Sequence, residues 1–259
     1  MKTYILLGAA LSTLTFSTST LASTPFFLAR SISGTVSEIQ SSIDPTPPKN
    51  FSDAKAWLSK ITLKYHPFAF YSGCKLKTSG RSIRIDLHSC NYKVRKDLKR
   101  ASRGEAEHIL PISWVYRGME CSNGKSSREA RSYCQRTSNE FNRAEGDLVN
   151  LQYAVGEING DRAHFKYAKL ESGFDYGLAG KIYFDETGRR FMPPKEKWGW
   201  IGRVHLYMAD KYPVRYSKSY RRLMESWSML EPTKWECDYN NLLKRDFNVE
   251  NPYTTRICF

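Results

Sequence analysis

Arg103 to Trp114 reads Arg-Gly-Glu-Ala-Glu-His-Ile-Leu-Pro-Ile-Ser-Trp, and the expected fold is centred on these residues. Neighbouring side chains of a β-strand point to opposite faces, so Glu107 and His108 share a surface only if the strand bends or ends there. Pro111 favours an ending, because it lacks an amide hydrogen and restricts the residue before it. A carboxylate for a divalent cation beside a base of near-neutral pKa suits phosphodiester hydrolysis. We therefore predict a catalytic site here.

A second stretch, residues 146–162, reads Gly-Asp-Leu-Val-Asn-Leu-Gln-Tyr-Ala-Val-Gly-Glu-Ile-Asn-Gly-Asp-Arg. Together with Glu-x-Glu-His-x-x-Pro, it resembles the endonuclease I family, periplasmic and secreted bacterial nucleases with a ββα-metal (His-Me finger) site. The resemblance extends from about His66 to the C-terminus. It also includes Cys90-Asn-Tyr-Lys-Val-Arg-Lys, Arg100-Ala-Ser-Arg, Leu206-Tyr-Met-Ala-Asp and Trp235-Glu-Cys.

Composition indicates a globular protein but does not identify its binding partner. The 259 residues can bury a substantial core, and hydrophobic and aromatic contents of 41% and 14% suit a globular protein. Forty Lys and Arg against 26 Asp and Glu give a net charge of +14. Such a surplus favours a polyanion, an acidic membrane surface, or solubility alone.

The N-terminus and the cysteines predict the compartment. Lys2, an apolar run through Leu11 and the small residues up to Ala22 form a secretory signal over residues 1–22, cleaved after Ala22 or Ser23. Six cysteines agree with an oxidising compartment and allow fifteen complete pairings. We therefore expect a periplasmic or secreted protein without a membrane anchor.

The rest of the chain predicts one α+β domain over residues 51–259, after an extended lead-in over residues 23–50. Residues 51–65 should form a helix, with Ser52 as its cap and Leu58, Ile61 and Tyr65 on its buried face. Residues 82–87 alternate as a half-buried strand does. We expect further helices over residues 201–212 and 220–230, a polar loop from Cys121 to Cys134, and an irregular segment over residues 173–188.

The resemblance implies a single mixed domain built around a ββα-metal motif and stapled by disulfides. By likeness to family pairings, and because each pair closes a local loop, the expected bridges are Cys74–Cys90, Cys121–Cys134 and Cys237–Cys258. In the family, the histidine at the position of His108 activates the attacking water.

The resemblance also implies metal ligands. Glu107 matches the family's metal-binding carboxylate, with Glu105 as a competitor, and Asn150 matches the second ligand, presented from the helix of the motif. Mg²⁺ accepts a carboxylate and an amide oxygen and keeps several waters, with Mn²⁺ or Ca²⁺ as alternatives. The residues alone instead favour a helix cap or turn amide for Asn150.

Arginines and neighbouring residues complete the predicted site. Arg131 matches by position the arginine with which the family holds the scissile phosphate, and Arg128 is the alternative. The basic residues between Lys93 and Arg103 would ordinarily form a solvated face, but their place beside the site favours nucleic-acid contact. Asn159-Gly160 is typical of a turn, and we expect Asp161 and Arg162 to form a structural pair.

The expected function is that of a Mg²⁺-dependent, sequence-nonspecific endonuclease. The resemblance implies DNA and RNA as substrates and 5′-phosphate products, and we expect a monomer. Specificity for a base sequence is not expected, because phosphate contacts carry no sequence information. The chain has no paired Cys-x-x-Cys zinc motif, P-loop or Gly-x-Ser-x-Gly elbow. The alternative is a secreted nucleic-acid-binding protein that has lost catalysis.

Overall fold

The computed structural model describes residues 46–80, 82–178 and 180–258. The predicted signal peptide and residues 23–45 of the predicted lead-in lie outside this part of the chain. The described residues mix helices with short strands and carry three disulfides, which confirms the α+β class. Among the described helices, none is both long enough and apolar enough to cross a membrane.

Two antiparallel strands and the helix after them form the centre of the fold. Strand β3 (Gly104–His108) pairs with β4 (Leu151–Val155), with His108 opposite Leu151. Every residue of β4 is buried, because α1 packs on it and other elements cover the rest. Helix α6 (Gly156–Arg162) follows β4 without a loop. A Cβ at Gly156 would lie 2.5 Å from the carbonyl oxygen of Arg100, so only glycine permits this close packing.

Helix α1 (Phe51–Tyr65) has the predicted bounds but a different cap. The side chain of Asn50, and not that of Ser52, accepts the hydrogen bond from the amide of Asp53, at 3.0 Å. Leu58 and Ile61 are buried as predicted. Tyr65 is 46% exposed, which corrects its predicted place on the buried face.

A hairpin precedes the central strands. Strands β1 (Lys75–Ser79) and β2 (Ser82–Asp86) pair antiparallel, and the Cys74–Cys90 disulfide closes the hairpin as predicted. The predicted strand ends one residue early, because Leu87 begins the short 3-10 helix η1 (Leu87–Cys90). Helix α2 (Leu98–Ala101) then leads into β3.

The segment between β3 and β4 is helical, which corrects the predicted polar loop. It contains α3 (Ile112–Tyr116), η2 (Glu120–Ser122), α4 (Ser127–Thr137), α5 (Asn139–Glu145) and η3 (Leu148–Asn150). Helix α4 begins at a capping box, in which Ser126 and Glu129 satisfy each other's backbone amides. We predicted a loop because the segment is mostly polar, although the capping box is a signal for the start of a helix. The predicted Cys121–Cys134 disulfide joins η2 to α4.

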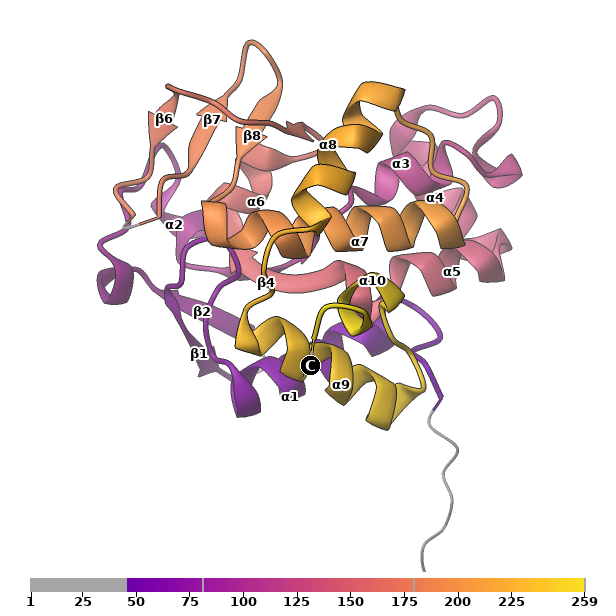
Figure 1. Ribbon diagram of the computed structural model, residues 1–259, viewed down its shortest axis with the longest axis horizontal. Helices are drawn as coiled ribbons and strands as arrows, with labels where there is room; N and C mark the ends of the chain where they lie inside the picture. Colours follow the sequence, from indigo (N-terminus) through magenta and orange to yellow (C-terminus); the bar gives the residue numbers. More distant parts are fainter. Residues whose placement is uncertain (1–45, 81, 179, 259) are drawn as a thin grey trace, which may run out of the picture. The chain divides into compact units, whose positions relative to one another are not determined.

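Residues 173–188, predicted to be irregular, contribute to a small sheet. Its strands are β5 (Lys166–Tyr167), β6 (Phe174–Asp175), β7 (Tyr183–Asp185) and β8 (Arg190–Met192), in the order β5-β8-β7-β6. Strands of two or three residues are too short for an alternating pattern to reveal. Figure 1 shows β6, β7 and β8 side by side at the upper left, away from α9 (Lys234–Phe247) and α10 (Pro252–Thr255) in the lower part of the view.

The C-terminal third is helical. After η4 (Lys195–Lys197) come α7 (Trp198–Lys211), α8 (Lys218–Ser228), α9 (Lys234–Phe247) and α10 (Pro252–Thr255). The first two match the predicted helices within about three residues at each end. Gly202 lets α7 and α8 approach closely, since a Cβ there would lie 2.6 Å from the carbonyl oxygen of Met224.

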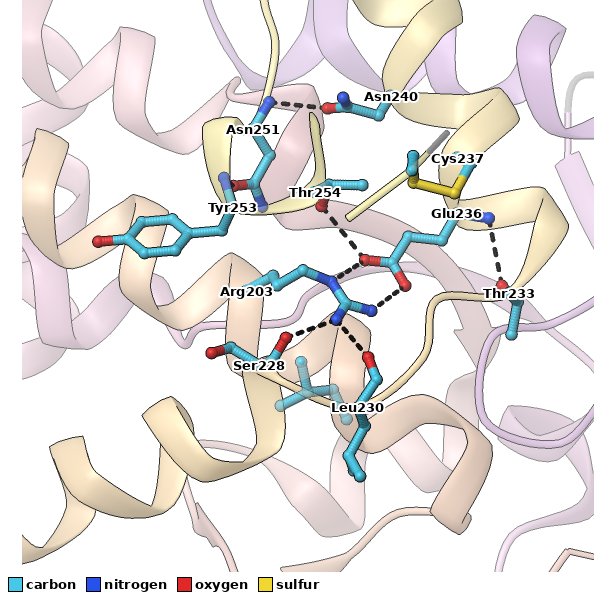
Figure 2. Close-up of polar contacts among 12 residues, drawn as sticks. Arg203, Ser228, Leu230, Thr233, Glu236, Cys237, Asn240, Asn251, Tyr253 and Thr254 are labelled. Carbon is cyan, nitrogen blue, oxygen red and sulfur yellow. Dashed lines mark hydrogen bonds and ion pairs between the residues drawn. A yellow bond between two sulfur atoms is a disulfide. The ribbon is translucent and has the colours of Figure 1, made fainter. Parts of the chain in front are cut away.

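A buried ion pair joins α7 to α9 (Figure 2). Arg203 Nε and Nη2 each donate to the carboxylate of Glu236 at 2.6 Å, and Nη1 donates to the carbonyl oxygens of Ser228 and Leu230 at 2.7 Å. The hydroxyl of Thr254 donates to Glu236 at 3.2 Å. Because both charges are at most 2% exposed, the pair depends on its full set of hydrogen bonds.

Two further contacts fasten the C-terminal tail to α9. The predicted Cys237–Cys258 disulfide forms. The side-chain oxygen of Asn240 accepts a hydrogen bond from the backbone amide of Asn251 at 2.7 Å (Figure 2). The tail therefore closes over the Arg203–Glu236 pair.

Replacing Glu236 with alanine would leave the Arg203 guanidinium buried without a carboxylate. We expect the free energy of unfolding to fall by about 3–5 kcal/mol, measured by urea denaturation of the oxidised protein. The matched control is Glu225→Ala, which removes a 49%-exposed partner of Arg221 and should cost at most about 1 kcal/mol. Equal losses in the two variants would contradict a stabilising role for the buried pair.

Candidate active site

The predicted site residues on β3 face a cavity of about 840 Å³. Glu107, His108 and Arg131 all line it, so the structure brings together a carboxylate, an imidazole and a guanidinium from β3 and α4. Residues 82–84 and parts of α1, α3 and α6 also contribute to its walls. Further lining residues that carry charge are Lys55, Arg84, Lys99, Arg103, Glu105 and Arg162.

His108 is the last residue of β3 and is held in one orientation. Its Nε2 lies 2.9 Å from the carbonyl oxygen of Glu145, and since a carbonyl only accepts, Nε2 carries the hydrogen. The Phe51 ring packs against the imidazole at 4.9 Å between centroids. Burial lowers the pKa of His108 to about 3, so the ring is neutral near neutral pH. Its Nδ1 therefore keeps a lone pair that can accept a proton.

Glu107 is 2% exposed, and its two carboxylate oxygens differ. Oε1 accepts a hydrogen bond from the Tyr71 hydroxyl at 3.0 Å and forms an ion pair with Arg162 Nη1 at 2.9 Å. Burial raises the pKa of Glu107 to about 7, although the Arg162 charge opposes that rise. Among the described residues, no hydrogen-bond donor contacts Oε2. Oε2 is therefore the oxygen available to a ligand.

Arg162 holds the end of β3 so that the side chains of Glu107 and His108 both line the same cavity. It is 1% exposed, and it donates from Nη1 to the carbonyl oxygen of His108 at 2.8 Å and from Nη2 to that of Ile109. These bonds hold the backbone at the end of β3. Pro111 had led us to predict that the strand ends here. The expected Asp161–Arg162 pair is wrong, because Arg162 pairs with Glu107 at the end of β3.

Asp161 faces the basic run instead. Arg95 donates to it through Nε at 2.8 Å, and Lys96 pairs with it at 3.2 Å. The buried carboxylate of Glu157 accepts the backbone amides of the same turn. Part of the predicted basic surface is therefore paired with acidic groups of the protein itself. Of that run, Lys99 and Arg103 line the cavity.

Arg131 projects from α4 to the cavity and is bound on one side only. Its Nε donates to Glu145 Oε1 at 2.7 Å, and its side chain is 41% exposed. No described acceptor contacts its two terminal nitrogens, which leaves a fork for an anion. Arg128, the alternative, is exposed and does not line the cavity. Geometry thus favours Arg131.

Asn150 does not reach the cavity. It lies in η3 before β4, and not on the helix from which the metal ligand was expected. Its Oδ1 accepts the amide of Leu110 at 2.7 Å and its Nδ2 donates to the carbonyl oxygen of Leu110 at 3.0 Å. Since Asn150 is wholly buried, both polar atoms serve the backbone that follows His108. This role matches the turn amide that the residues alone favour.

Asn159 is the amide that lines the cavity, from the middle of α6. Its Nδ2 donates to Glu105 Oε2 at 2.9 Å, and no described donor contacts its Oδ1. Glu105 is in turn neutralised by Arg100 and Arg103. The sequence did not single out Asn159 as a site residue, because Asn-Gly is typical of a turn. Its place four residues after a buried strand was the signal that it lies on the helix.

The oxygen donors on the cavity fit a hard cation. Glu107 Oε2 and Asn159 Oδ1 are a carboxylate and an amide oxygen, the pair expected for Mg²⁺. Among the described residues, no three His, Cys, Asp or Glu side chains gather into a metal cluster. Protein ligands here would thus be few, with water completing the coordination, as Mg²⁺ prefers.

Comparison with known proteins identifies the family. The model of the endonuclease I family matches residues 51–258. An extracellular deoxyribonuclease of Aeromonas hydrophila is 35% identical over 212 residues, 81% of this chain and 90% of the relative. A periplasmic deoxyribonuclease of the same species is 34% identical, over 74% of this chain and 80% of the relative. An endonuclease-1 of Buchnera aphidicola (strain APS) is 34% identical, over 82% of each. This chain therefore belongs to the endonuclease I family.

Proposed function

We propose that the protein is a secreted or periplasmic, Mg²⁺-dependent endonuclease that cleaves DNA, and RNA as well, without sequence preference. The observation that carries the proposal is the meeting of His108, Glu107 and Arg131 on one basic cavity. Relatives named extracellular deoxyribonuclease and periplasmic deoxyribonuclease support DNA as a substrate and the compartment, and a relative named endonuclease-1 supports endonucleolytic cleavage.

His108 is the general base of the proposed reaction. Its Nε2 hydrogen is held by the Glu145 carbonyl, so Nδ1 takes the proton from water as the water attacks phosphorus. The Phe51 ring and the surrounding core keep the imidazole neutral and oriented. Arg131 offers two N–H groups to the scissile phosphate and stabilises the charge that develops on it.

Glu107 and Asn159 would hold the cation through Oε2 and Oδ1. When bound, Mg²⁺ supplies charge stabilisation to the phosphate and the departing 3′ oxygen. Arg162 and Tyr71 fix the Glu107 carboxylate from its other oxygen, which keeps Oε2 directed to the cavity. Departure of the 3′ oxygen leaves a 5′-phosphate on the product.

The basic lining of the cavity supports the proposed lack of sequence preference. Its cations, among them Lys55, Lys99 and Arg103, suit phosphates, which are the same in every sequence. The rival function, nucleic-acid binding without catalysis, is tested by incubating plasmid DNA with the protein in Mg²⁺ and in EDTA. Cleavage in Mg²⁺ alone supports the enzyme; binding without cleavage in either buffer supports the rival.

His108→Ala should cleave plasmid DNA about 10²- to 10⁴-fold more slowly than the parent, because the base is lost. Its affinity for Mg²⁺, measured by calorimetry, should be unchanged, because no metal ligand is removed. The control is His88→Ala, which removes an exposed histidine outside the cavity and should cleave normally. Loss of Mg²⁺ binding in His108→Ala would instead make the imidazole a ligand.

The two asparagines give opposite expectations. Asn159→Ala, like the isosteric Glu107→Gln, should raise the Mg²⁺ concentration needed for half-maximal cleavage, because an oxygen ligand is lost. Asn150→Ala should leave that concentration unchanged but lower the free energy of unfolding by about 1–3 kcal/mol, because the Leu110 backbone loses its partners. Mg²⁺ titration of cleavage and urea unfolding measure both. The reverse pattern would return the ligand role to Asn150.

Binding should weaken steeply with salt. On unrelated duplexes, the His108→Ala variant should show equal log-log slopes of about −0.9 for each phosphate contacted. Adding Lys99→Ala should make the slope shallower by about one contact, whereas Lys181→Ala, exposed and outside the cavity, should not change it. A flat salt response, or one strongly favoured sequence, would argue for specific base readout.

A further inference from the structure

A second cavity, of about 610 Å³, lies beside the catalytic one and is not used by the proposed mechanism. We call it the Trp114 cavity. It is built by the end of α3, residues 164–166 after α6, the β7–β8 turn and the α7–α8 loop. His164 lines both cavities, so the two cavities adjoin at this residue. Its volume falls within the range of small-ligand sites.

The charge of the Trp114 cavity is wholly positive. Its lining includes Arg117, Lys166, Arg189 and Arg215, and no described carboxylate. None of the four pairs with a described acidic side chain. The adjacent Arg190, by contrast, is neutralised by Asp185 at 2.8 Å. The cavity therefore attracts an anion.

Three aromatic rings also line the cavity, and each is half-buried and braced by its neighbours. Phe165 stacks on Phe184 with ring centroids 5.7 Å apart. Trp114 meets Tyr220 edge to face at 5.6 Å, and Tyr216 meets the same ring at 5.5 Å. Rings fixed in this way lose little conformational entropy when a flat group packs on them.

From these features we infer that the Trp114 cavity binds an unpaired nucleotide of the substrate strand, with its base against the rings and its phosphate on the arginines. Stacking of bases on aromatic side chains beside a basic groove is how proteins bind single strands without sequence preference. A paired base is covered by its neighbours and cannot reach such rings. The inference rests on the proposed nuclease function and adds a preference to it, for single-stranded substrates or frayed ends.

The test compares a labelled single-stranded oligonucleotide with a blunt duplex, using fluorescence anisotropy at fixed salt in the His108→Ala background. Arg117→Ala/Arg215→Ala should weaken single-strand binding about fivefold to tenfold and duplex binding by about twofold or less. Both arginines are exposed and lack described ion-pair partners, so the fold should survive. The matched control is Arg222→Ala/Arg256→Ala, which removes the same charge outside both cavities and should weaken both substrates equally.

A change in the substrate tests the rings without disturbing the protein. A single abasic residue moved along the single strand should reduce affinity several-fold at one position, and this position should lose its effect in Arg117→Ala/Arg215→Ala. Equal losses on both substrates, or no position dependence, would overturn the inference and leave a general basic surface. Failure of the parent protein to cleave plasmid in Mg²⁺ would refute the proposed function instead, so the two failures are distinguishable.

Discussion

The buried guanidinium of Arg162 is the constraint on which the site depends. It holds Glu107 through one carboxylate oxygen and the carbonyl oxygens of His108 and Ile109 through its other donors. A buried cation requires such a set of partners, since an unpaired charge is costly in the interior. The same contacts end β3 at His108 and direct two neighbouring side chains to one cavity. Because Arg162 is the last residue of α6, the helix and the strand end are held together.

Glu145 likewise holds several side chains in place on the other side of the site. Its carbonyl oxygen orients His108, and its carboxylate binds both Arg131 and Gln135. One residue at the end of α5 thus sets the distance between the proposed base and the proposed phosphate-binding arginine. The Cys121–Cys134 disulfide anchors the helix that carries Arg131, so this half of the site rests on α4 and α5 being fixed.

The basic residues of the chain have different roles. Some cations of the Lys93–Arg103 run neutralise internal carboxylates, as Arg95 does with Asp161. Lys99 has no described acidic partner and can meet phosphates at the catalytic cavity. The Trp114 cavity adds cations that no described acid neutralises, beside rings braced by Tyr220 and Phe184. Net charge alone could not distinguish these roles, because pairing depends on which segments fold against one another.

Local patterns in the sequence were sufficient for the bounds of α1 and for the end of β3 shortly before Pro111. Those features depend on periodicity, on backbone chemistry or on neighbouring residues. The family resemblance supplied the three disulfides and the predicted roles of Glu107, His108 and Arg131, and the structure places these three side chains on one cavity. Which asparagine faces the cavity depended on the tertiary structure, because the same amide either satisfies a buried backbone, as Asn150 does, or lines a cavity, as Asn159 does. Likewise, the partner of Arg162 and the Trp114 cavity arise from segments distant in sequence, and a local pattern carries no information about such contacts.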